Sequence, residues 1–157
     1  MTAAILRVGE NKKGFSLLEL LVVLLLLALS SALVIPAIDA GLKQRQVRRS
    51  ALELAAVARG LRRTAIYHGS LQSLVLDPSE SSYEAFGGNK VVLPADVRIS
   101  AIQGGEPTGQ GLTRFLFFPN GSILSGEIGL SGGEGSAYLI RLDPLSGRVL
   151  VERESRP

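Results

Sequence analysis

Residues 11–25, NKKGFSLLELLVVLL, decide the fold of the N-terminal part of this chain. Two lysines and a glycine stand directly before an apolar run that carries one carboxylate, Glu19, near its start. From Leu20 to Ile38 there is no charged residue. A helix of that length would measure roughly 28 Å, about the thickness of the hydrocarbon core of a bilayer. The sequence therefore predicts a membrane-spanning helix over residues 15–38.

The order of these features differs from that of a secretory signal peptide. A signal peptide has a shorter apolar region and is cleaved after it. Here the processing-like sequence Lys-Lys-Gly-Phe, residues 12–15, precedes the apolar run. Cleavage at that point would remove residues 1–14 as a leader and leave the apolar helix on the mature protein. The alternative is a plain N-terminal membrane anchor in which these four residues have no role.

This arrangement resembles the type IV pilin and pseudopilin superfamily. The resemblance rests on Gly14, Phe15 and Glu19, followed by an apolar stretch that contains Pro36. In this family a prepilin peptidase cuts after the glycine and methylates the new N-terminal residue. The resemblance implies cleavage between Gly14 and Phe15, N-methylation of Phe15, and Glu19 as the fifth residue of the mature protein.

Glu19 is an ionisable residue at the edge of the expected membrane helix, where such residues are costly and usually have a partner or a task. In the family this glutamate is thought to meet the positively charged N-terminal amine of the same or a neighbouring subunit during assembly. Opposite charges at close range in low-dielectric surroundings would fix the register between subunits. The alternative is a hydrated Glu19 at the level of the lipid headgroups, with no function.

Positive charge is concentrated in one segment of the mature chain. Residues 43–63 have a net charge of +6, whereas residues 64–157 have a net charge of −3. Basic residues flank the apolar run on both sides, so the positive-inside rule gives no clear orientation. A simple count of these basic residues places the C-terminal part in the cytoplasm. The family resemblance implies the opposite orientation, with the leader facing a cytoplasmic-side peptidase, and we follow the resemblance.

Residues 39–69 are expected to continue the helix as an amphipathic segment that ends near Tyr67. Small and apolar residues recur at spacings of three and four, which places them on one face; they are Val47, Ala51, Leu54, Ala58, Leu61 and Ala65. Pro36 removes one backbone hydrogen bond, so we expect a helix kink there. His68, the one histidine, precedes Gly69 and is interpreted as a helix-end residue.

Residues 70–157 are expected to form a β-rich head, because short apolar runs alternate with turn sequences. Asn120-Gly121 is a hairpin signal, and residues 104–111 and 131–136 read as loops. We expect seven or eight strands in one or two antiparallel sheets packed on the amphipathic half of the helix. The predicted strands are residues 71–76, 83–86, 91–93, 97–102, 113–118, 123–130, 138–142 and 148–152.

The head sequence narrows the resemblance to the GspH/FimT class of minor pilin-like proteins. The residues that carry it are 74–78, 93–98, 117–121 and 142–149. The class implies an α+β fold, a long N-terminal helix packed on a C-terminal antiparallel β-sandwich-like head. It implies a minor pseudopilin of type II secretion, near the tip of the pseudopilus, which helps to export folded proteins across the outer membrane. The alternative is a minor type IV pilin of the FimT kind, acting in pilus assembly or DNA uptake.

The resemblance also implies the location and the partners. We expect a single-pass protein of the bacterial inner membrane, with its head in the periplasm. The expected partners are the prepilin peptidase, other major and minor pseudopilins, the inner-membrane assembly platform and membrane lipid.

The sequence offers no catalytic constellation. One histidine and no cysteine leave no metal cluster and no Ser-His or Cys-His pair. The glycine-rich runs lack the spacing and the lysine of a phosphate-binding loop. Asp143 lies in an ordinary Asp-Pro turn, for which we predict no metal. We therefore expect no enzyme activity and no cofactor.

Three arginines near the C-terminus are candidates for nucleic-acid contact, because DNA-binding members of the class use an arginine-rich patch there. They are Arg148, Arg153 and Arg156. Glu152 and Glu154 are interleaved with them, and strand alternation would place Arg148 and Arg153 on opposite faces. Backbone binding needs several cations on one face. We therefore favour solvated charges on an edge strand and do not expect nucleic acid as a partner.

Overall fold

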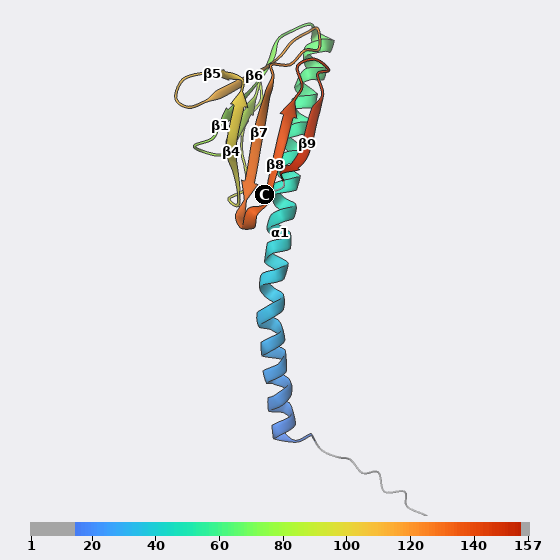
Figure 1. The fold of residues 1–157 in the computed structure, drawn as a ribbon, viewed down its shortest axis with the longest axis vertical. Helices are drawn as coiled ribbons and strands as arrows, with labels where there is room; N and C mark the ends of the chain where they lie inside the picture. The colour runs from blue at the N-terminus through green and yellow to red at the C-terminus, as the bar shows by residue number, and fades with distance from the viewer. Residues whose placement is uncertain (1–14, 155–157) are drawn as a thin grey trace, which may run out of the picture. The chain divides into compact units, whose positions relative to one another are not determined.

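The computed structural model describes the backbone of residues 15–154 and their side chains, except those of residues 32–42 and residue 134. The chain divides between Ile38 and Asp39 into two compact units. Helix α1, Leu17–His68, contributes residues to both (Figure 1). The backbone is helical on both sides of Pro36, and the kink expected there stays a prediction. Within the described residues, no helix has a stretch long and apolar enough to qualify as a membrane span.

In the second unit, α1 presents one face to the core of the head. All six residues of the predicted stripe, Val47, Ala51, Leu54, Ala58, Leu61 and Ala65, are buried. Ser50 and Ala55 are buried beside them, so the packed face is wider than predicted. Gly69 follows the helix with φ +62°, the left-handed conformation that commonly ends a helix and that glycine adopts without strain. The predicted helix end is thereby confirmed to within one residue.

Nine strands in the described part of the chain form two antiparallel sheets. The five-stranded sheet has the order β3-β2-β1-β6-β5, with β1 Gln72–Asp77, β2 Ser82–Ala85, β3 Lys90–Val92, β5 Glu106–Pro107 and β6 Thr113–Phe117. The four-stranded sheet has the order β4-β7-β8-β9, with β4 Val97–Gly104, β7 Gly126–Gly132, β8 Ala137–Leu142 and β9 Val149–Glu154. A short 3₁₀ helix, η1 Gly133–Gly135, connects β7 and β8.

The predicted loop over residues 104–111 is wrong in part, because β5 lies inside it and pairs with β6. The strand has only two residues, one of them a proline, and follows two glycines, so no periodicity in the sequence indicates it. The predicted loop at 131–136 is also too long, since β7 continues to Gly132.

One hydrophobic core joins the helix stripe to both sheets. Its largest fully buried side chains come from all three elements, and include Leu54 of α1, Leu74 and Phe115 of the five-stranded sheet, and Ile128 and Ile140 of the four-stranded sheet. β9 lies beside this part of α1 (Figure 1), and the Arg59 guanidinium of the helix donates to the Val149 carbonyl of the strand at 3.1 Å. The α+β fold with a sandwich-like head is confirmed.

Between β6 and β7 the chain passes from the five-stranded sheet to the four-stranded sheet at Gly126. The predicted hairpin at Asn120-Gly121, leading into a strand over residues 123–130, is therefore corrected. A tight turn does form there, with the Phe118 amide donating to the Ser122 carbonyl. Only the Phe117–Ile123 bridge continues the pairing, and then the chain leaves for β7. A Cβ at Gly126 would lie 2.4 Å from the buried Phe115 ring. The crossing therefore requires glycine, and strand 123–130 begins later than predicted.

Candidate functional site

The start of α1 is the first candidate site, because the processing and assembly predictions meet there. Ser16 caps the helix: its hydroxyl accepts from the Leu18 amide at 3.2 Å, and its carbonyl accepts from the Leu20 amide at 3.1 Å. Phe15 therefore lies outside the helix, and its side chain is 74% exposed. An accessible, non-helical backbone is what a peptidase requires. Gly14, on the other side of the predicted cut, lies outside the described residues.

Glu19 lies in the first turn of α1 and is exposed. A carboxylate is favoured there because the helix N-terminus carries a partial positive charge. Ser16 and Glu19 have the spacing of a capping box, in which the serine caps the helix and the glutamate reaches back to the cap amide. Only the serine half of this motif is formed in the structure. The spacing was readable in the sequence but was not predicted to form a cap, and Glu19 makes no capping hydrogen bond in the described part of the chain.

The first turns of α1 are apolar on every side. Large hydrophobic side chains are exposed at nearly every position; they are Leu17, Leu18, Leu20–Leu27 and Leu29. Polar groups that follow are satisfied within the helix, since the Ser30 and Ser31 hydroxyls donate to the carbonyls of Leu26 and Leu27 at 2.8 Å each. A helix that is apolar all round is stable when lipid or other helices surround it. This segment is thus suited to contacts outside the chain.

Some arginines of the basic segment 43–63 contact the head. The Arg62 guanidinium donates to the Gly121 carbonyl at 2.8 Å. It also lies against Gly147, where a Cβ would come within 2.4 Å of the Arg62 Nε. Arg62 therefore joins two turns of the head, and Arg59 joins the helix to β9. Arg49 pairs with Glu53 on the exposed face.

The C-terminal arginines do not gather into one basic face within the described residues. Arg153 lies on β9 and Arg148 directly precedes that strand, and both are exposed. Acidic groups are interspersed, since Arg141 on β8 lies 2.8 Å from Glu127 and 3.6 Å from Glu152. Arg156 lies outside the described residues. This distribution does not favour a nucleic-acid surface, and the contact stays a prediction.

Two Asp-Pro turns of the head have the same internal bonding. Asp77 accepts from the amides of Ser79 and Glu80 at 3.0 and 3.2 Å, and Asp143 accepts from the Leu145 amide at 2.9 Å and the Ser146 hydroxyl at 2.7 Å. Hydrogen bonds from the hydroxyls of Ser79 and Ser146, above all, lower the pKa of Asp77 and Asp143, respectively. Both aspartates are therefore structural turn residues.

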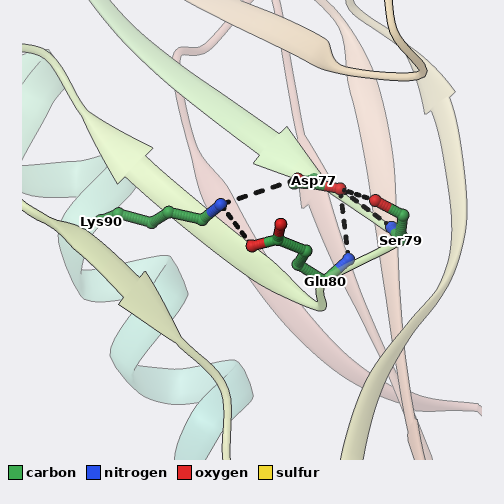
Figure 2. Close-up of polar contacts among 4 residues, drawn as sticks. All are labelled: Asp77, Ser79, Glu80 and Lys90. Carbon is green, nitrogen blue, oxygen red and sulfur yellow. Dashed lines mark hydrogen bonds and ion pairs between the residues drawn. The ribbon is translucent and has the colours of Figure 1, made fainter.

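Beside Asp77 the head has a charged cluster that the sequence analysis did not find. The Lys90 ammonium lies between the carboxylates of Asp77 and Glu80 (Figure 2), 3.8 Å from Asp77 and hydrogen-bonded to Glu80. The hydrogen bond with Glu80 raises the pKa of Lys90. Strand pairing creates this cluster: β2–β3 pairing sets Lys90 opposite Glu84, and β1–β2 pairing sets Asp77 opposite Ser82. No spacing along the chain reveals it.

The described residues do not assemble an enzyme-like centre. Among them, no group of three or more histidine, aspartate or glutamate side chains could hold a metal ion. His68 contacts the Tyr67 ring edge-on at the end of α1.

Comparisons with known proteins found a matching sequence motif, a relative in sequence and a relative in structure. Residues 10–35 match the model of the prokaryotic N-terminal methylation motif. The chain is 34% identical over 127 residues to type II secretion system protein H of Xanthomonas campestris pv. campestris, covering 79% of this chain and 74% of that protein. The fold is similar to that of the minor pseudopilin EpsH from the type 2 secretion system of Vibrio cholerae, with a TM-score of 0.57 and 13% identity. That match covers 69% of this chain and 97% of the EpsH chain. The chain therefore belongs to the type II secretion system protein H family.

Proposed function

We propose that this chain is a minor pseudopilin that acts by assembly into the pseudopilus of a type II secretion system. The observation that carries the proposal is the apolar first segment of α1, which lies within the matched methylation motif, residues 10–35, and exposes its leucines on all sides. Such a surface requires lipid before assembly and neighbouring helices after it. A head with its own closed core would then be displayed at the surface of the assembly.

The proposed life cycle begins with processing. A prepilin peptidase cuts between Gly14 and Phe15 and methylates the amine of Phe15. Residues 15–38 hold the precursor in the inner membrane as a single span, with the head in the periplasm. An inner-membrane assembly platform then transfers the subunit into the pseudopilus. The exposed, non-helical position of Phe15 supports the first step, because the scissile bond must fit an extended peptidase site.

Glu19 is proposed to set the register between subunits. Its carboxylate lies one turn from the new N-terminal amine and is exposed, so it is free to meet the amine of its own or a neighbouring chain. Within an apolar helix bundle, an unpaired carboxylate is costly, and pairing with an amine offsets that cost. A subunit at the wrong height would leave both charges unpaired.

A deletion strain tests the proposed function. Exported enzymes are expected to accumulate in the periplasm of the strain and to return to the medium when the intact gene is restored. Unchanged secretion would contradict the proposal and direct attention to twitching and transformation, the activities expected of a FimT-like pilin.

A further inference from the structure

The outer face of the five-stranded sheet carries a pocket of about 370 Å³ beside the charged cluster of Figure 2. Side chains alternate across a sheet, and on β1 it is Leu74 and Leu76 that face the core. Asp77 and Val75 on β1, and the residues opposite them on β2, Ser82 and Glu84, therefore belong to the outer face. They line the pocket together with Glu80 and Lys90.

Ser82 lies in the wall of this pocket and has an unsatisfied hydroxyl. It is 1% exposed, and its Oγ is the one buried side-chain polar atom in the described part of the chain without a hydrogen-bond partner. Buried polar groups in folded proteins are almost always paired. The structure gives this hydroxyl in the pocket wall no hydrogen bond, and a polar group bound in the pocket would supply one.

The charges around Ser82 define which group would be attracted. Three carboxylates, of Asp77, Glu80 and Glu84, face one ammonium, of Lys90, so the pocket has a net charge of −2. Lys90 is held by Asp77 and Glu80, whereas Glu84 has no ion pair among the described residues. The next cation along the same cross-strand row, Arg114 on β6, lies beyond Val75 and stands opposite Glu106 on β5.

We propose that this pocket binds an arginine side chain of a neighbouring subunit in the pseudopilus. The proposal rests on the proposed function and names the chemistry of the partner. A guanidinium has five N–H donors and no acceptor, and the free groups of the pocket, the Ser82 Oγ and the Glu84 carboxylate, are acceptors. Its planar fork can reach a carboxylate and a hydroxyl together, which the compact ammonium of lysine does less well. An anionic ligand would be repelled.

A titration of the mature, full-length chain in detergent micelles tests this proposal with N-acetyl-L-arginine amide as the probe. Saturable shifts of the backbone amide signals are expected at Ser82, Glu84 and Lys90. Ser82→Ala and Glu84→Gln should each weaken binding by about tenfold, because hydrogen bonds to charged groups contribute at that level. Glu106→Gln, which neutralises an exposed carboxylate of the same face outside the pocket, is the matched control and should change nothing.

Three results of the titration would overturn the proposal. They are the absence of saturable shifts, equal weakening by Glu106→Gln, and stronger binding of Ca²⁺ than of the arginine amide at the same signals. Tighter binding of N-acetyl-L-lysine amide would likewise reject the guanidinium. Unchanged thermal unfolding of the two pocket variants establishes that any weakening comes from the pocket.

A secretion assay separates this proposal from the proposed function. Glu84→Gln is expected to lower secretion in the complemented deletion strain, whereas Glu106→Gln restores it fully. Normal secretion by Glu84→Gln in a strain whose deletion abolishes secretion would overturn the arginine pocket and leave the proposed function standing. Normal secretion in the deletion strain itself would reject the proposed function, whatever the titration shows.

Discussion

The two ends of helix α1 have the same backbone conformation and opposite surroundings. Residues 17–31 expose leucines and valines on all sides, whereas residues 43–68 bury one stripe of small and apolar residues and expose arginines. Secondary structure alone does not separate them, since one helix contains both. The spacing of the apolar residues separates them. A helix that is apolar on all sides is stabilised by partners outside the chain, whereas a helix with one apolar stripe packs that stripe against a sheet of the same chain.

The largest expected effect comes from preventing the first segment from reaching its partners. Gly14→Val should block cleavage, because the peptidase must accept the glycine before the scissile bond. The precursor would keep its 14-residue leader and an unmethylated Phe15, and secretion would be lost. Mass analysis of the N-terminus measures both. Gly9→Val, in the leader but away from the cut, is the control. Recovery of a methylated Phe15 from the Gly14→Val strain would contradict the prediction.

Glu19 tests whether the first segment needs a specific charge or only an apolar surface. Glu19→Val makes the segment uniformly apolar, so it should be processed normally and remain in the membrane. It should fail to co-purify with other pseudopilins, because the pairing that sets register is gone. Glu19→Gln removes the charge but keeps a polar side chain of the same length, so it separates the loss of charge from the gain of apolar surface. Normal co-purification of both variants would reject the assembly role.

A matched pair of leucines measures the contrast between the two segments directly. Leu54→Ala, in the fully buried stripe, should lower the free energy of unfolding of the head by about 3 kcal/mol, through lost burial and a cavity. Leu24→Ala, on the exposed apolar segment, should leave that free energy unchanged. Denaturant unfolding of the two variants in detergent, followed by circular dichroism, provides the comparison. Equal effects would show that the segments are not energetically distinct.

Arg62 tests whether the basic segment is part of the head. Arg62→Ala leaves the Gly121 carbonyl without its donor and should cost about 1–2 kcal/mol of unfolding free energy. Arg63→Ala removes an exposed arginine that has no hydrogen bond or ion pair within the described residues, and it should cost nothing measurable. Thermal melting of the pair decides the question. Equal melting temperatures would show that the contact of Arg62 with Gly121 does not stabilise the head.

The smallest effect is expected in acid, at the turn that Arg62 supports. The Ser146 hydroxyl and the amides of Leu145 and Ser146 lower the pKa of Asp143. A carboxylate whose pKa is lowered by folding stabilises the fold at pH values above its unfolded pKa of about 3.9. This stabilisation is lost as the pH falls through the folded-state pKa. Asp143→Asn should therefore lower stability at neutral pH and flatten the acid-unfolding curve. Asp96→Asn, at an exposed aspartate, should leave the curve unchanged. An acid-unfolding curve of Asp143→Asn that runs parallel to that of the unmodified protein would contradict the prediction.

Local patterns in the sequence were sufficient to predict the helix, its packed stripe and most strands. They could not predict features that arise when distant segments meet. β5 is too short to show a period, and the departure of the chain at Gly126 depends on the Phe115 ring. The pocket around Ser82 depends on strand register, which unites residues from three strands. By contrast, the capping spacing of Ser16 and Glu19 was present in the sequence and was overlooked.

The order of strands along the chain has a consequence for folding. β4 belongs to the four-stranded sheet, yet it lies in sequence between strands of the five-stranded sheet. Neither sheet can therefore be completed before the other has begun, and the last strand, β9, ends at Glu154. Such interlocked, long-range pairing delays folding until the segments of both sheets are available. The head can thus become a single cooperative unit only after β9 is present to pair with β8.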